Sequence, residues 1–100
     1  MNSYNKYTDL QINELVATRL KKKCLLTEES VLAYMDSGYR TFDPCNNPSD
    51  AMPIIIENKI AMNPKDNIWQ CGSGFNVAEN KNPLRACMEV FLMMRDAENN

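Results

Sequence analysis

Apolar residues recur at helical spacing in two segments, one near each end of the chain. Near the start, Thr8 or Asp9 can cap a helix that runs to about Leu20. Near the end, Asn82-Pro83 supplies a cap and a first-turn proline for LRACMEVFLMMRD, residues 84–96. Apolar side chains cover this second helix nearly all round. That pattern predicts a helix that is central to the core or shared with a second copy in a homo-oligomer.

The middle of the chain alternates turn residues with short apolar runs. TEES at residues 27–30 resembles a capping box, so we predict a short helix over 31–35. The stretch 39–42 alternates aromatic and polar residues, which predicts a strand. Asn47-Pro48 then predicts a helix that ends near 57–58, although the β-branched residues 54–56 are also compatible with a strand.

The stretch between residues 59 and 81 predicts strands. We expect strands at 59–62, 68–71 and 75–78, which are separated by a proline-asparagine turn at 63–67 and by Gly72-Ser73-Gly74, and a polar loop over 79–81. Residues 24–26 are compatible with a short strand or a helix exit. The fold class that follows is a small, single α+β domain. It has three to four helices packed on a short antiparallel sheet, the C-terminal helix central to the core, and frayed tails at 1–7 and 97–100.

Composition and charge narrow the functional classes. The formal net charge is −2, which argues against a protein that neutralises many phosphates, so we expect no nucleic acid. The four cysteines form no CxxC pair and histidine is absent, so we expect neither a metal nor a cofactor. The start of the chain lacks the apolar core of a signal peptide and no run is long enough to span a membrane, so we expect a cytoplasmic protein.

The chain has no residue set that is typical of an enzyme. Without histidine, a Ser-His or Cys-His pair cannot form within it. Asp43 and Asp50 are separated by a proline-rich turn, and we interpret them as turn and cap residues rather than an acid–base pair. We therefore predict a protein that is not an enzyme and has no catalytic residues.

Binding is the more defensible chemistry. Helix starts at Asn47 and Asn82 present amide hydrogens that attract anions. Arg85 lies in the first turn of the last helix, where a cation opposes the helix dipole, so it needs an anionic partner. An internal salt bridge to Asp43, Asp50 or Glu57 is our favoured interpretation, and a bound phosphate or carboxylate is the alternative. Aromatic residues can stack on a ligand or pack in the core. The candidate ligand-binding residues are Arg85, Asn82, Asn47, Asp50, Asp43, Trp69 and Tyr39.

Three stretches together resemble the NinX-like family of small phage proteins. They are TDLQINELVATRL, then FDPCNNPSDAMPIIIENKI with the single Trp69 after it, and NPLRACMEVFLMM. The resemblance covers residues 8–20 and 39–96 and implies a phage accessory protein in the cytoplasm of a bacterial host. It implies no substrate. The chain departs from the family near Met52-Pro53, where tryptophan or glycine is expected.

Two functions fit these observations. The first is a non-enzymatic protein that binds a small anionic or nucleotide-like ligand connected with host defence, through helix amides, Arg85 and an aromatic wall. The alternative is a protein-interaction module that binds and inhibits a host bacterial protein.

Overall fold

The computed structural model describes residues 2–98, and within them it confirms the α+β class. The chain forms three α-helices, one short 3-10 helix and two three-stranded antiparallel sheets. In chain order the elements are η1 (Tyr4–Lys6), α1 (Asp9–Arg19), β1 (Cys24–Leu26), β2 (Val31–Met35), β3 (Gly38–Thr41), α2 (Pro48–Glu57), β4 (Met62–Lys65), β5 (Ile68–Ser73), β6 (Asn76–Asn80) and α3 (Pro83–Glu98). The strands thus divide into two sheets, β1-β2-β3 and β4-β5-β6.

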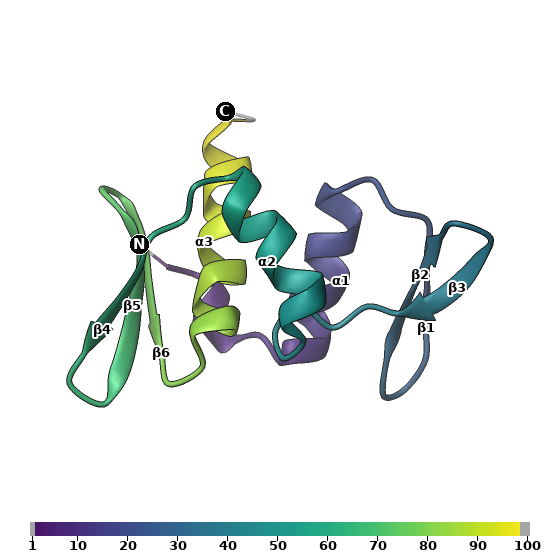
Figure 1. The fold of residues 1–100 in the computed structure, drawn as a ribbon, viewed down its shortest axis with the longest axis horizontal. Helices are drawn as coiled ribbons and strands as arrows, with labels where there is room; N and C mark the ends of the chain where they lie inside the picture. The colour runs from purple at the N-terminus through teal and green to yellow at the C-terminus, as the bar shows by residue number, and fades with distance from the viewer. Residues whose placement is uncertain (1, 99–100) are drawn as a thin grey trace.

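The helices occupy the middle of the molecule, and the two sheets lie at opposite ends (Figure 1). The C-terminal helix α3 packs on β5 and β6 and also contacts α1 and α2. Every residue from Arg85 to Met93 is buried. The prediction that this helix is central to the core is confirmed, and its apolar sides are covered within one copy of the chain.

The predicted caps of α1 and α2 are present. The hydroxyl oxygen of Thr8 accepts a hydrogen bond from the backbone N–H of Gln11, and the side-chain oxygen of Gln11 accepts one from the backbone N–H of Thr8, which completes a capping box. Asn47 accepts a hydrogen bond from the backbone N–H of Ser49 and starts α2. Residues 54–56 are therefore helical, and Ile54 is buried in the core.

The helix predicted over 31–35 is wrong, because this segment is strand β2. Thr27 uses its hydroxyl to close a tight turn: the oxygen accepts from the N–H of Ser30 at 2.9 Å, and the Thr27 N–H donates to the Ser30 carbonyl. The turn joins β1 to β2, with Leu25 opposite Leu32. The threonine thus has the capping chemistry that the sequence suggested, but it closes the turn of a hairpin instead of starting a helix.

The strands of the second sheet differ from their predicted bounds. β4 runs through Pro64, where a turn was expected, because this edge strand does not need the proline N–H in its ladder. The turn itself lies at Asp66-Asn67, and Asp66 has a φ of 56°. β5 continues through Gly72, where a break was expected, and β6 extends into 79–80, which was predicted to be a loop.

The N-terminal segment was expected to be a frayed tail, and this is wrong for residues 2–7. Tyr4 is only 8% exposed and its hydroxyl contacts Asp96 of α3. Asn2 donates a hydrogen bond to Glu89 at 2.6 Å. At the other end, Ala97 and Glu98 belong to α3 rather than to a tail. The remaining predicted tail positions, 1 and 99–100, lie outside the described residues.

Candidate functional site

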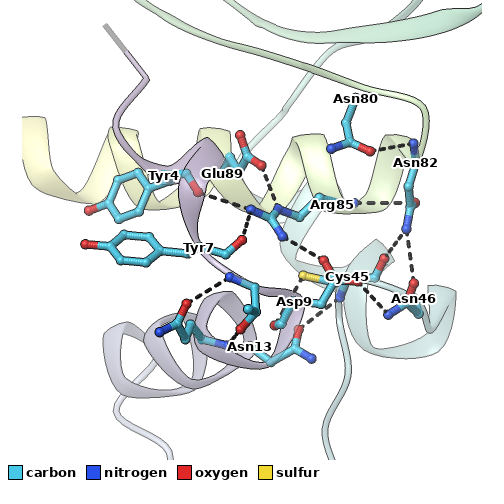
Figure 2. Close-up of polar contacts among 12 residues, drawn as sticks. Tyr4, Tyr7, Asp9, Asn13, Cys45, Asn46, Asn80, Asn82, Arg85 and Glu89 are labelled. Atoms are coloured by element: carbon cyan, nitrogen blue, oxygen red, sulfur yellow. Dashed lines mark hydrogen bonds and ion pairs between the residues drawn. The ribbon is translucent and has the colours of Figure 1, made fainter.

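The strongest candidate residue, Arg85, lies in a buried polar network at the start of α3 (Figure 2). Its side chain is 8% exposed and forms two ion pairs: Nη1 to Asp9 Oδ1 at 2.7 Å, and Nε to Glu89 Oε2 at 2.6 Å. The remaining guanidinium nitrogen, Nη2, donates to the backbone carbonyls of Tyr4 at 3.1 Å and Tyr7 at 2.7 Å. The guanidinium therefore ties α3 to the N-terminal stretch that contains η1 and the start of α1.

Arg85 is paired within the chain, as the favoured interpretation held, but the three partners that were predicted for it are wrong. None of Asp43, Asp50 and Glu57 contacts it; Asp9 and Glu89 do. Burial by itself lowers the pKa of Arg85. The hydrogen bonds to Asp9 and Glu89 raise the pKa by more than burial lowers it, so the pKa lies above its ordinary value. A cation in the first turn of a helix opposes the helix dipole, and these two carboxylates offset that effect.

Asn82 caps α3 and fastens it to the segment before α2. Its side-chain oxygen accepts from the backbone N–H of Leu84 at 3.0 Å. Its amide nitrogen donates to the carbonyl of Cys45 at 2.6 Å and to the side-chain oxygen of Asn46 at 3.2 Å. The amide hydrogens that were predicted to attract an anion thus already have a partner within the chain.

Asn13 is the residue of this network that the sequence reasoning missed. It is 4% exposed, donates to Asp43 Oδ1 at 2.7 Å, and accepts from the backbone N–H of Cys45 at 3.1 Å. A usable signal was present, because Asn13 follows Ile12 on the buried side of an amphipathic helix, where a polar side chain requires partners. Asp43 also donates its backbone N–H to Asp50 Oδ2 at 2.9 Å.

A small cavity of about 150 Å³ borders the network on the side of the β1-β2-β3 sheet. Its lining includes Asp9, Asn13, Asp43 and Asn46 from the network, together with Glu29 of the β1–β2 turn. Three of these side chains are carboxylates and none of the lining residues is a lysine or arginine. A site with this charge repels an anion.

The aromatic candidates do not join this network. Trp69 lies on β5 and Tyr39 on β3, in the sheets at opposite ends of the molecule (Figure 1). Trp69 is half-buried and packs against the core. Asn47 caps its own helix. Hydrogen bonds therefore connect five of the candidates, Arg85, Asn82, Asp43, Asp50 and Asn47, directly or through Asn46, whereas Trp69 and Tyr39 lie elsewhere.

The most exposed cluster of apolar side chains lies on the β1-β2-β3 sheet. Leu25, Tyr34 and Tyr39 are 50%, 47% and 40% exposed, and strand register places Leu25 opposite Leu32 and Tyr34 opposite Tyr39. The two tyrosine rings meet edge to face, with centroids 5.3 Å apart. Because side chains alternate along strands, these four residues share one face, which we call the outer face. The outer face was not identified from the sequence, because a helix was predicted over 31–35.

Within the described residues no helix is long and apolar enough to cross a membrane. In the same part of the chain, no three Cys, Asp or Glu side chains are arranged to hold a metal ion.

The fold and the network define a small α+β protein in which a capped, buried C-terminal helix carries an arginine that is paired within the chain. A family profile described as Bacteriophage P22, NinX matches residues 3–95, and the chain belongs to this family. The match extends over the N-terminal segment, β1 and β2 as well as the stretches that showed the resemblance. Comparison with curated proteins gave no match.

Proposed function

We propose that the chain is a non-enzymatic phage accessory protein that works in the bacterial cytoplasm by binding a host protein. Family membership supports the phage origin. The observation that carries the proposal is the outer face, on which Leu25, Leu32, Tyr34 and Tyr39 gather on one side of a sheet.

The outer face has the composition of a contact surface. Helix α1 is the element that packs on β1 and β2, and the buried residues Val31 and Ala33 point toward it. Tyr34 alternates with those residues along β2, and Tyr39 is its partner on β3, so both face the opposite side. Tyrosine is enriched at protein interfaces because it combines a large apolar body with a polar tip. A sheet with one buried and one exposed apolar face is expected to find a partner for the second.

The small anionic or nucleotide-like ligand has less support. Four hydrogen bonds within the chain already engage the Arg85 guanidinium. The neighbouring cavity is lined by carboxylates, which disfavour a phosphate. A nucleotide would have to replace Asp9 and Glu89 as the arginine's partners, and Glu89 is 1% exposed.

The network also offers little for catalysis. Asp9 and Asp43 accept hydrogen bonds from Arg85, Asn13 and Asn46, so their carboxylates are engaged in holding the fold. Burial raises the pKa of the Cys45 thiol, which disfavours the thiolate that a nucleophile requires. These features support a protein that acts by binding rather than by chemical turnover.

Affinity capture from bacterial lysate with matched variants tests the proposal. The double variant Tyr34→Ser/Tyr39→Ser removes both outer-face rings, and Phe75→Ser removes a 96% exposed ring from the turn between β5 and β6. We expect a captured protein that the wild type and Phe75→Ser retain and that the double variant loses. A wild type that captures nothing, or equal capture by all three, refutes the proposal.

A further inference from the structure

We infer that the partner contributes an extended segment, which joins the free edge of β3 as a fourth strand and carries apolar and basic side chains toward α2. This inference deepens the proposed function and relies on it for the partner being a protein. Strand addition supplies affinity through main-chain hydrogen bonds and specificity through pockets for alternate side chains.

The register of the sheet leaves β3 with unused backbone groups. Phe42 donates its N–H to the Val31 carbonyl, so Arg40, two residues earlier, also bonds toward β2. Tyr39 and Thr41 alternate with these residues, so their N–H and C=O groups point away from β2. No hydrogen bond among residues 2–98 reaches the backbone groups of Tyr39 or Thr41 from another element.

The other sheet protects its edges and β3 does not. β4 carries Pro64 and Lys65, two residues that discourage an added strand. β6 packs along α3. β3, with the sequence Gly-Tyr-Arg-Thr, has no proline, and its last three residues are exposed. Of the edges of β3, β4 and β6, that of β3 is therefore the one on which an added strand meets least resistance.

A groove lies on the inner side of the same sheet. Its volume is about 280 Å³, and its apolar lining includes Met35 at the end of β2, Phe42 just after β3, and Pro53 and Ile54 of α2. Alternation places Met35 and Phe42 on the face opposite Tyr34 and Tyr39. Every second side chain of a strand added to β3 thus points to the side on which the groove lies.

Charge complementarity indicates what those side chains are. Asp50 and Glu57 of α2 line the groove, and neither forms an ion pair with any other described residue. The single cation of the lining, Lys22, lies over the Phe42 ring at 5.7 Å from its centroid. Because the lining has two carboxylates and one ammonium, it favours a lysine or arginine in the added strand, next to the apolar side chain that enters the groove.

A peptide titration followed by ¹⁵N NMR tests the inference on the full chain. The probe is the heptapeptide acetyl-TITVTKT-amide, which places Ile, Val and Lys on one side of a strand, and a control peptide replaces Lys by Glu. We expect the amides of Tyr39 and Thr41 to shift and to become protected from solvent exchange. The Lys peptide should bind about threefold more tightly than the Glu peptide. The inference is overturned if millimolar Lys peptide leaves both amides unchanged, or if shifts map to the β4-β5-β6 sheet.

Two variants separate backbone pairing from side-chain contact. Thr41→Pro removes the outward N–H and should weaken peptide binding about tenfold, whereas Thr41→Ala keeps the N–H and should bind like wild type. Equal weakening by both variants contradicts strand addition. If Thr41→Pro fails to fold, the wild-type exchange rates still decide. This titration needs no host protein, so the two experiments can fail separately. If the peptide binds but lysate capture fails, the proposed function alone is refuted. If lysate capture succeeds but the peptide does not bind, only strand addition at the edge of β3 is refuted.

Discussion

The Nη1 atom of Arg85 lies 2.7 Å from Oδ1 of Asp9, and this ion pair links the first turns of two helices. Asp9 suits the start of α1, because a carboxylate stabilises the positive end of the helix dipole. Arg85 is in the unfavourable position at the start of α3. Their pairing, with Glu89 on the far side of the guanidinium, allows α1 and α3 to meet at their N-terminal ends.

Arg85→Met should destabilise the fold by about 3–5 kcal/mol, because it leaves the buried Glu89 carboxylate without its cation. Chemical denaturation measures this loss in the free energy of unfolding. The double variant Arg85→Met/Glu89→Met should recover much of it, since an apolar pair replaces the buried charges. As a control, Arg40→Met removes an arginine that is 63% exposed in its ion pair with Asp36, and should change stability by less than about 1 kcal/mol. Similar losses for Arg85→Met and Arg40→Met would contradict the structural role of the network.

Asn13→Leu should cost about 2 kcal/mol, although it places an apolar residue at a buried position of α1. The reason is that Asp43 loses a donor and the backbone N–H of Cys45 loses its acceptor. Thermal and urea unfolding measure the change. Asn5→Leu makes the same exchange at an exposed site and should be nearly neutral. A stabilised Asn13→Leu protein would show that the apolar packing of α1 outweighs these two bonds.

Thr27→Val should destabilise the protein by about 1 kcal/mol, because the variant keeps the shape of the side chain but loses the hydroxyl that closes the β1–β2 turn. Urea denaturation measures the effect. Since the turn holds Leu25 opposite Leu32, the same variant should also broaden the NMR signals of the outer face. Unchanged stability would mean that the hairpin does not depend on this side chain.

Stability should fall as the pH rises above about 9, in part because of Cys45. Burial, and then the negative charge of Asp9, raises the pKa of this thiol above its ordinary value of 9.0. Above that pH the unfolded chain loses the proton while the folded chain keeps it. The folded state then binds more protons, and each pH unit costs up to about 1.4 kcal/mol for this group. Denaturation between about pH 8 and about pH 10, in reducing buffer, should show a shallower slope for Cys45→Ala. Equal slopes would contradict a protonated, buried thiol.

The sequence by itself determined the elements whose signals are local. Thr8 with Gln11, Asn47 with Pro48, and Asn82 with Pro83 each start a helix through side chains that bond to amides two or three residues away. The apolar circumference of α3 likewise predicted its central place, because burial follows from side-chain chemistry.

Only the tertiary structure decided features that depend on distant partners. The Thr27 hydroxyl can cap a helix or close a turn with equal chemistry, and pairing with β1 and β3 selected the strand at 31–35. Arg85 required an anion, but its choice of Asp9 depends on how α1 packs against α3. The N-terminal residues appeared polar and unattached, yet the carbonyls of Tyr4 and Tyr7 satisfy the same arginine. Such contacts join residues about 80 positions apart, and no local pattern in the chain records them.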